Sequence, residues 1–219
     1  MVRGFIFDVD GTLVSHKVDG EKLRSTTSRE LVRMGFDISF MDGNNLHTQE
    51  IIDRAREQIE SGSVKIKFEL FRAALNEALD ALEMDWNALA QPIPGTNELL
   101  DRLRAKNVKL ATLTNSGRAP SEWLMKQHDL LRRFDFTLSR DDVTKLKPSP
   151  DGVLKALDLM GLPKEEVVYV GDSVIDVKAA KAAGIKVAGV TTGRYSHERL
   201  QNEGSDYIMD SLSELLDLV

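Results

Sequence analysis

The stretch Phe5-Ile6-Phe7-Asp8-Val9-Asp10-Gly11-Thr12 decides the fold: a run of strand-forming apolar residues ends abruptly in two carboxylates, a glycine and a hydroxyl. A strand buried in a parallel sheet reads as a continuous apolar run, so the acidic residues belong at its carboxyl end, where open α/β sheets bind ligands. If the chain stays extended at Val9, the carboxylates of Asp8 and Asp10 leave it on the same side. Two close carboxylates repel each other unless a cation or a shared proton relieves them. The stretch therefore predicts a metal site with a nucleophile and an acid/base, the alternative being a plain turn rich in Asp and Gly.

The composition is that of a globular protein. Of the 219 residues, 42% are hydrophobic and 29% are charged, which allows one core and a smaller insertion. No apolar run approaches the roughly 18–20 residues that span a bilayer, so we expect no membrane association. The chain enters a strand almost at once, without a charged leader and cleavage site, which argues against secretion. Cysteine is absent, which excludes disulfides, thiolate catalysis and zinc–thiolate sites, and we expect a cytoplasmic protein.

The net charge of −6 bears on the partners of the protein. A nucleic-acid-binding surface is normally basic, so we expect no nucleic-acid partner. The overall field also opposes an anionic substrate. Such a substrate would have to be attracted locally, by a metal ion or by a few well-placed lysines.

Strands and helices alternate along most of the chain. Further strands are expected over 108–114, 134–138, 167–171, 186–190 and 206–209. One helix is expected to follow Pro150, with Ser149 as its cap, and to end near Gly161. Another is expected over 174–183, ending at Gly184. Strand–helix alternation with short connections predicts an α/β fold, with a parallel sheet covered by helices on both faces.

The region from about residue 16 to residue 91 breaks this alternation. It contains no convincing strand, and its apolar residues recur at helical spacing: Leu23, Leu31, Met34; Ile51, Ile52, Ala55, Ile59; Phe68, Phe71, Leu75, Ala78, Leu82. Pro92 and Pro94-Gly95 mark the return to the sheet. We therefore expect a core domain made of residues 1–16 and 91–219, and an inserted helical domain made of residues 17–90.

Two further segments place polar groups where strands or loops end. Thr114-Asn115-Ser116 follows the expected strand over 108–114, and its side chains and backbone N–H groups can hold phosphoryl oxygens. The alternative is an ordinary Ser/Asn turn. Lys147 lies beside Pro148 in a proline-stiffened loop that enters a helix, and it is a better candidate than Lys145, although a surface lysine is usually only solvated.

A third segment, Gly171-Asp172-Ser173 with Asp176, ends a buried strand. Its spacing brings Asp172 and Asp176 to one helix N-terminus, where helix capping is the simple explanation. Together with Asp8 and Asp10, however, they supply the hard oxygen ligands that Mg²⁺ prefers. Four coincidences at four strand or loop ends favour a single site over four unrelated turns.

In this order, the four segments resemble the haloacid dehalogenase superfamily of phosphotransferases. The matching residues are Asp8-Val9-Asp10-Gly11-Thr12, Thr114-Asn115, Lys147-Pro148, and Gly171-Asp172-Ser173 with Asp176. The resemblance covers essentially the whole chain and implies a Rossmann-like sheet with an inserted helical cap domain. Features of the shared core look closest to the phosphoglycolate phosphatase-like branch: Pro94-Gly95, Asp141-Asp142-Val143, Gly184, Thr192-Gly193 and residues 204–208. Many capped members carry Asp-Ser shortly after the first motif, whereas Ser15-His16 stands here, so the contacts of that aspartate do not carry over.

The resemblance implies a phosphatase mechanism. The implied substrate is a small phosphomonoester, either phosphoglycolate-like or a sugar phosphate. Asp8 would attack its phosphorus and form an aspartyl phosphate, with Mg²⁺ and Lys147 neutralising the charges. Asp10 would protonate the leaving alcohol and then activate the water that hydrolyses the intermediate. The implied metal ligands are Asp8, Asp10 through its backbone carbonyl, and Asp172, with Asp176 in the outer shell or supporting Lys147. The implied phosphate-binding groups are Thr114, the N–H of Asn115 and Lys147, while Thr12 supports the loop.

Other functions stay open at this point. A β-phosphoglucomutase-like phosphosugar isomerase uses the same core, and a non-catalytic phosphate-binding regulator would keep the fold without turnover. Dehalogenation is disfavoured because halide leaves without a proton, so that chemistry has no need of Asp10. The inserted domain offers polar candidates for substrate contact: His16, Lys17, Asn44, Asn45, His47, Arg54 and Lys65. The protein is expected to be a monomer or a homodimer.

Overall fold

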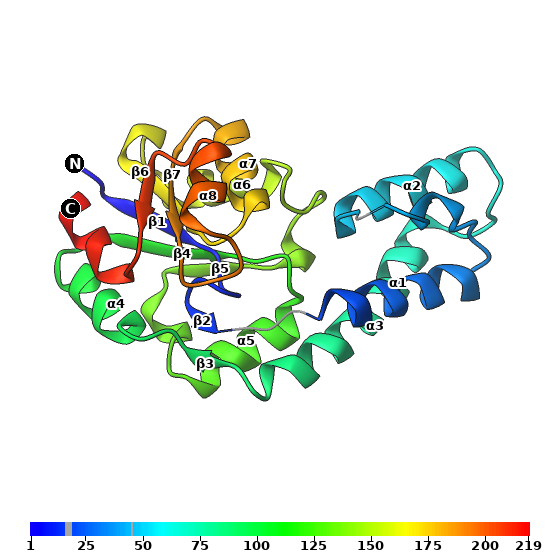
Figure 1. Cartoon of the computed structure of the whole chain (residues 1–219), viewed down its shortest axis with the longest axis horizontal. Coiled ribbons are helices and arrows are strands. Elements are labelled where there is room, and N and C mark those ends of the chain that lie inside the picture. The colour runs from blue at the N-terminus through cyan, green and yellow to red at the C-terminus, as the bar shows by residue number, and fades with distance from the viewer. Residues whose placement is uncertain (16–18, 45) are drawn as a thin grey trace. The chain divides into compact units, whose positions relative to one another are not determined.

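The computed structural model of the protein describes residues 1–15, 19–44 and 46–219 (Figure 1). The chain divides into two compact units, one made of Met1–Lys17 and Asn87–Val219 and the other of Val18–Trp86. The domain boundaries expected from the sequence, after residue 16 and before residue 91, stay a prediction. Across the described residues, no helix combines the length and the apolar character that a membrane span requires.

A six-stranded sheet forms the centre of the larger unit. Its strands are β1 (Gly4–Phe7), β4 (Lys109–Leu113), β5 (Phe136–Leu138), β6 (Val167–Gly171), β7 (Lys186–Val190) and β8 (Tyr207–Met209). They lie in the order β5-β4-β1-β6-β7-β8, and each neighbouring pair is parallel. The first strand therefore lies inside the sheet, between β4 and β6, which explains why all of its residues are buried. The expected parallel α/β fold is confirmed.

Helices cover both faces of this sheet. They are α4 (Thr96–Ala105), α5 (Arg118–Gln127), α6 (Asp151–Met160), α7 (Val174–Ala183) and α8 (His197–Asn202), with 3-10 turns η2 (Leu131–Arg133), η3 (Arg140–Asp142), η4 (Lys164–Glu166) and η5 (Leu212–Leu218). Phe5 and Phe7 point into the hydrophobic cluster that α4 and α5 close, whereas Ile6 points into the cluster closed by α6 and α7. This period-two alternation along one strand builds a separate core on each face.

Several predicted boundaries agree with the structure and others are wrong. The strands over 167–171 and 186–190 and the helix over 174–183 match, and Gly184 ends that helix with φ 77°. The strand expected to start at residue 134 starts at Phe136, because the chain first turns through η2. Ser149 is not the N-cap of α6: Pro150 takes that position, and the Ser149 hydroxyl accepts a hydrogen bond from the backbone N–H of Asp151 at 3.4 Å.

A second, two-stranded antiparallel sheet joins the two segments of chain that make up the larger unit. It consists of β2 (Val14–Ser15) and β3 (Gln91–Pro92), with Val14 opposite Pro92. The Ser15 hydroxyl also donates a hydrogen bond to the Gln91 carbonyl at 3.0 Å. No sequence pattern predicts this two-stranded ribbon, because strands of two residues are too short to show an alternating pattern.

The smaller unit is helical, as its apolar spacing predicts. Its elements are α1 (Gly20–Arg33), η1 (Ser39–Met41), α2 (Thr48–Glu60) and α3 (Phe68–Asn87), the last of which ends just beyond the unit. Leu31 on α1, Ile52 on α2 and Leu75 on α3 are fully buried. The Phe36 and Phe71 rings pack with their centroids 5.1 Å apart. The Asp19 side chain caps α1 by accepting a hydrogen bond from the N–H of Lys22.

Candidate active site

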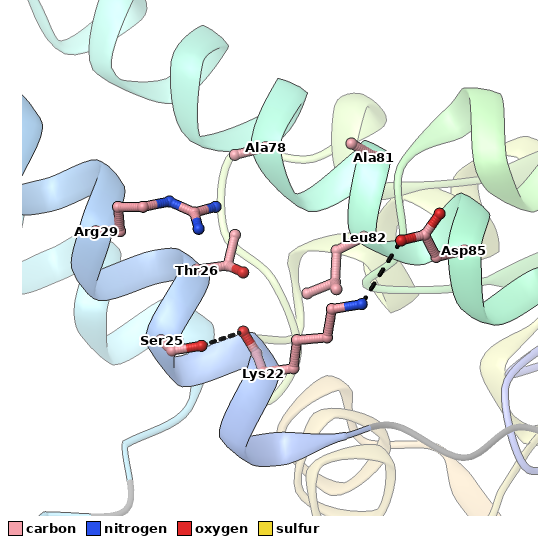
Figure 2. A pocket seen from close by; sticks show the side chains of 8 residues that line it. All are labelled: Lys22, Ser25, Thr26, Arg29, Ala78, Ala81, Leu82 and Asp85. Atoms are coloured by element: carbon pink, nitrogen blue, oxygen red, sulfur yellow. Dashed lines mark hydrogen bonds and ion pairs between the residues drawn. The ribbon is translucent and has the colours of Figure 1, made fainter.

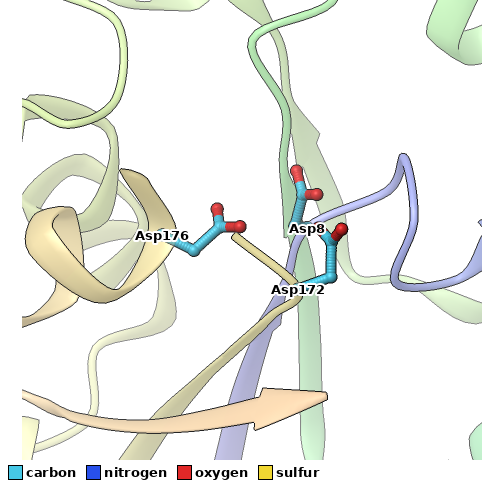
Figure 3. Close-up of side chains that lie close together, drawn as sticks. All are labelled: Asp8, Asp172 and Asp176. Carbon is cyan, nitrogen blue, oxygen red and sulfur yellow. The ribbon is translucent and has the colours of Figure 1, made fainter. Parts of the chain in front are cut away.

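Three carboxylates gather at the carboxyl edge of the large sheet (Figure 3). Asp8 follows β1, Asp172 follows β6, and Asp176 points toward both from the first turn of α7. One ligand oxygen from each lies within 4.8 Å of the others. The side chains are almost completely buried, with Asp8 6%, Asp172 5% and Asp176 0% exposed. Because β1 and β6 are neighbouring parallel strands, two residues far apart in the sequence end at the same place.

Lys147 lies against two of these carboxylates. Its Nζ is 2.6 Å from Asp8 Oδ1 and 2.6 Å from Asp176 Oδ1, and the residue is only 4% exposed. The Asn115 side chain holds the backbone of Lys147 on both sides: it donates to the Lys147 carbonyl and accepts from the Lys147 N–H, each at 3.0 Å. The amide that follows β4 therefore positions the loop that carries the lysine.

Asp10 has a different set of partners from Asp8. Its Oδ2 accepts hydrogen bonds from the Thr114 hydroxyl at 3.1 Å and from the Ser116 hydroxyl at 2.9 Å. The Ser116 N–H in turn donates to Thr114 Oγ1 at 3.0 Å. Because both hydroxyls donate to the same oxygen, they fix the orientation of the Asp10 carboxyl group. In this structure the Thr114 hydroxyl therefore donates its proton to Asp10.

Asp172 occupies a space that two glycines leave open. A Cβ atom at Gly11 would lie 2.5 Å from Asp172 Oδ2, and one at Gly193 would lie 1.9 Å from the same oxygen. Gly11 also has φ 87°, which side chains rarely tolerate. The N–H of Arg194 donates to Asp172 Oδ2 at 2.9 Å. Any larger residue at Gly11 or Gly193 would displace this carboxylate from the cluster.

Asp176 is held by protein groups on both of its oxygens. Oδ2 accepts from the N–H and the hydroxyl of Ser173 at the start of α7. Oδ1 accepts from Lys147 Nζ at 2.6 Å and from the Tyr169 hydroxyl at 2.9 Å. The resemblance left two roles open for Asp176, a place in the outer shell of the metal and support of Lys147, and these contacts favour support of Lys147.

The electrostatics of the cluster show an excess of negative charge. Burial raises the pKa of Asp8 well above its usual range; Lys147 opposes this effect, and Asp176 and Asp172 add to it. Burial, and then the charge of Asp176, raise the pKa of Asp172 to about 7. Burial alone would lower the pKa of Lys147, but Asp176 and Asp8 outweigh it and raise that pKa well above the usual value. The lysine is therefore firmly charged, and one ammonium does not balance three carboxylates.

The donor set fits a divalent metal ion. Close, buried carboxylate oxygens are the ligands that hard cations such as Mg²⁺ prefer. A cation would offset both the burial and the repulsion that raise the two carboxyl pKa values. The glycines at positions 11 and 193 keep Asp172 free of side-chain crowding. Asp8 and Asp172 are the residues best placed to hold such an ion.

Some residues of the site were not singled out from the sequence. The Tyr169 hydroxyl contacts both Lys147 and Asp176, and the Ser116 hydroxyl contacts Asp10. Tyr169 lies in a strand whose sequence is typical of a buried core. Its hydroxyl is the one polar side-chain group between residues 167 and 171, and it could have marked Tyr169 as a candidate site residue. The backbone N–H of Arg194 leaves no trace in a sequence pattern.

The smaller unit also contains a hollow, between α1 and α3 (Figure 2). This groove has a volume of about 320 Å³, and the ion pair between Lys22 and Asp85 lies along it with Nζ and Oδ2 3.6 Å apart. Its charged side chains are exposed, so it lacks the buried, convergent polar groups of a catalytic site. The acidic cluster of Figure 3 is therefore a better candidate for the active site than this groove.

The polar candidates of the inserted region are exposed where the structure describes them. Asn44, His47, Arg54 and Lys65 lie on the surface. The Asn44 side chain donates to the Phe40 carbonyl at 2.9 Å, and Arg54 pairs with Glu57 at 3.1 Å. His16, Lys17 and Asn45 lie outside the described residues. A substrate contact by any of these seven residues stays a prediction.

Comparison with known proteins gives consistent matches. Residues 5–190 match the family model described as haloacid dehalogenase-like hydrolase. Phosphoglycolate phosphatase 1 of Pseudomonas aeruginosa is 32% identical over 221 residues, covering 98% of this chain and 78% of that protein. Glyceraldehyde 3-phosphate phosphatase of Methanocaldococcus jannaschii is 29% identical, covering 100% of this chain and 97% of its own. Among solved structures, a Bacteroides fragilis protein proposed to be a haloacid dehalogenase-like hydrolase aligns with a TM-score of 0.68 and 26% identity, over 98% of this chain and 100% of its own.

Proposed function

Because the chain belongs to the haloacid dehalogenase-like hydrolase family, we propose that it is a Mg²⁺-dependent phosphatase that hydrolyses a small phosphomonoester through an aspartyl phosphate on Asp8. One observation carries the proposal: Asp8, Lys147 and Asp172 converge at one edge of the sheet. The P. aeruginosa and M. jannaschii relatives are named as phosphatases of two different small phosphorylated molecules. They support the class of substrate without selecting one of its members.

The contacts of Asp8 suit a nucleophile. Lys147 holds Asp8 Oδ1 at 2.6 Å, which fixes one carboxylate oxygen and offsets its charge. A carboxylate can attack a phosphorus atom only where its own charge and that of the phosphate are neutralised. When bound by Asp8, Asp172 and the backbone carbonyl of Asp10, Mg²⁺ would supply the remaining positive charge. The N–H of Asn115 is the proposed donor to the phosphoryl oxygens, and the Thr114 hydroxyl would join it by turning its single proton from Asp10 to the phosphoryl group.

Asp10 is the proposed general acid and base. The Thr114 and Ser116 hydroxyls hold its Oδ2, so the direction of the carboxyl group is set before a substrate binds. Its partners differ from those of Asp8, and one carboxylate can therefore attack while the other transfers a proton. The proton would go to the leaving alcohol in the first step and come from the attacking water in the second.

A phosphate-release assay with purified protein tests the proposal. The substrates are phosphoglycolate, glyceraldehyde 3-phosphate, sugar phosphates, nucleotides and pyrophosphate, each with Mg²⁺ and with a chelator. We expect Mg²⁺-dependent release of phosphate from at least one small monoester. Interconversion of sugar phosphates without release would indicate the isomerase instead. Binding of phosphate analogues without any cleavage would indicate a non-catalytic regulator.

The Asp10→Asn variant should reveal the role of Asp10 as an acid. Asn cannot supply a proton, so turnover should fall by about 10²–10⁴-fold for substrates whose alcohol leaves poorly. p-Nitrophenyl phosphate has a leaving group that needs no proton, so the loss should be much smaller there. The measurement is kcat on both kinds of substrate. An equal loss on the two would contradict the role of Asp10 as the acid.

Metal binding should depend on pH. The pKa of Asp172 is about 7 in the folded protein, against a usual value of 3.8. Between these values the folded state holds a proton that the unfolded state lacks, so this group makes the metal-free protein less stable as the pH rises through that range. A metal ion needs the ionised carboxylate.

Mg²⁺ should therefore raise the melting temperature more at about pH 8 than at about pH 6. The measurement is thermal unfolding with and without Mg²⁺ at the two pH values. The Asp172→Asn variant is the control and should lose most of the Mg²⁺ effect. An equal Mg²⁺ effect at both pH values would contradict binding through Asp172.

A further inference from the structure

Tyr169 places a hydroxyl group inside the site from the middle of β6. The residue is 0% exposed. Its hydroxyl oxygen lies 3.0 Å from Lys147 Nζ, 2.9 Å from Asp176 Oδ1 and 3.3 Å from the Leu113 carbonyl. Burial, and then the charge of Asp176, raise the pKa of Tyr169 well above its usual value, so the hydroxyl keeps its proton and can donate it. The proposed phosphatase mechanism assigns this group no task.

The distances around the Lys147 ammonium favour one arrangement of its hydrogen bonds. The ammonium has three protons and, among the described residues, four oxygens within reach. The two carboxylate oxygens are closest, at 2.6 Å each, while the Tyr169 hydroxyl and the Leu113 carbonyl lie at 3.0 and 3.2 Å. Tyr169 accepts from the ammonium and gives its own proton to the nearer acceptor, Asp176 Oδ1.

Asp176 Oδ1 therefore receives two donors, one from Lys147 and one from Tyr169. A carboxylate oxygen that already accepts one hydrogen bond attracts a second donor less strongly. The Tyr169 proton thus weakens the pull of Asp176 on the ammonium. Without it, Asp176 would draw Lys147 away from Asp8, since both carboxylates hold the same nitrogen at the same distance.

We infer that Tyr169 is a positioning residue that keeps Lys147 directed at Asp8, by accepting one proton of the ammonium and donating its own to Asp176. The inference rests on the proposed function, in which the Lys147–Asp8 pair prepares the nucleophile. Tyr169 does not touch the substrate in this scheme. It acts through the lysine.

A second lysine–tyrosine pair, between the neighbouring strands β7 and β8, provides a matched control. Lys186 Nζ lies 3.1 Å from the Tyr207 hydroxyl and 5.5 Å from the centre of its ring. The corresponding distances for Lys147 and Tyr169 are 3.0 and 5.6 Å. The two pairs share their chemistry and these distances, but Lys186 is exposed, whereas Lys147 is buried between Asp8 and Asp176. The Tyr207→Phe variant therefore removes an equivalent hydroxyl without touching the site.

The test compares the Tyr169→Phe and Tyr207→Phe variants of the full chain. Phe keeps the ring and its packing, so both variants should fold, and rates are measured well below each melting temperature. We expect kcat of the Tyr169→Phe variant to fall about tenfold, as for the loss of one well-placed hydrogen bond, with KM changed by less than about twofold. The Tyr207→Phe variant should keep the wild-type kcat and KM. A purely structural hydroxyl would lower only the melting temperature.

A second readout does not depend on turnover. In ¹⁵N NMR spectra, the buried ammonium of Lys147 should give a signal with slow proton exchange in the wild-type protein. Its exchange should become faster in the Tyr169→Phe variant and stay slow in the Tyr207→Phe variant. If the wild-type protein releases no phosphate from any monoester, the proposed function fails, and the NMR comparison still decides whether Tyr169 holds the lysine. Unchanged kcat together with unchanged exchange in the Tyr169→Phe variant would overturn the inference.

Discussion

The Asp8→Asn variant should lose turnover by at least about 10⁴-fold. An amide is not a nucleophile at neutral pH, and no aspartyl phosphate can form at this position. The variant keeps the shape of the side chain, and Lys147 keeps its contact with Asp176 at 2.6 Å. The loss should therefore appear in kcat on every substrate that the wild-type protein cleaves.

The stability of the Asp8→Asn variant should not fall with its activity. The pKa of Asp8 is raised in the folded protein, chiefly by burial, so this group lowers the stability of the fold as the pH rises from its usual pKa of 3.8 to the raised pKa. Asn removes the ionisation. The variant should be at least as stable as the wild-type protein, and its advantage should grow toward higher pH. Thermal unfolding at several pH values measures this.

The Asp206→Asn variant is the matched control for Asp8. Asp206 also pairs with a lysine, with its Oδ2 2.8 Å from Lys181 Nζ, but on the surface of the protein. It should retain normal turnover. Trapping of a phosphorylated protein during turnover completes the test, because the wild-type chain and the Asp206→Asn variant should form one and the Asp8→Asn variant should not. Turnover above about 1% of wild type in the Asp8→Asn variant would contradict the assignment of Asp8 as the nucleophile.

The Lys147→Met variant should lose both activity and stability. The ammonium lies between Asp8 and Asp176 at 2.6 Å from each, and all three side chains are buried. Removing one partner of a buried ion pair leaves an uncompensated charge and costs about 3–5 kcal/mol. Loss of a charged group that stabilises the reacting phosphoryl group should lower kcat by about 10²–10³-fold.

The loss of stability should be larger at about pH 8 than at about pH 6, because the carboxylates can take up protons at the lower pH. The pKa of Lys147 lies well above this range in the wild-type protein, so a difference between the two pH values reports the carboxylates and not the lysine. The measurement is denaturant unfolding at both pH values. The Lys181→Met variant is the control: its pair with Asp206 is partly exposed and should be worth about 0–1 kcal/mol. A Lys147→Met variant as stable as this control would contradict the buried ion pair.

Much of the fold could be read from the sequence, for local reasons. The strand over 167–171 is a continuous apolar run ended by Gly171, and the helix over 174–183 ends at a glycine that adopts a left-handed conformation. Signals of this kind lie within a few neighbouring residues. The ribbon of β2 and β3 has no such signal, since each strand has two residues and its pairing partner lies far along the chain.

The candidate site likewise has some features that the sequence predicts and others that it does not. Asp8, Asp172 and Lys147 could be selected because polar residues that follow buried strands or enter helices stand out in a local pattern. The sequence alone also determined that a parallel sheet would gather strand ends at one edge. Which side chain contacts which was decided only by the tertiary structure.

The order of the strands brings β4, β1 and β6 side by side, and with them come contacts that no local pattern contains. Lys147 reaches Asp8 across 139 positions of sequence, and Thr114 reaches Asp10 across 104. The sequence indicates only that Tyr169 belongs to the core. The structure shows that its hydroxyl lies 3.0 Å from the buried ammonium of Lys147. Hydrogen bonds extend over about 3 Å, so only the folded chain determines which donors and acceptors meet.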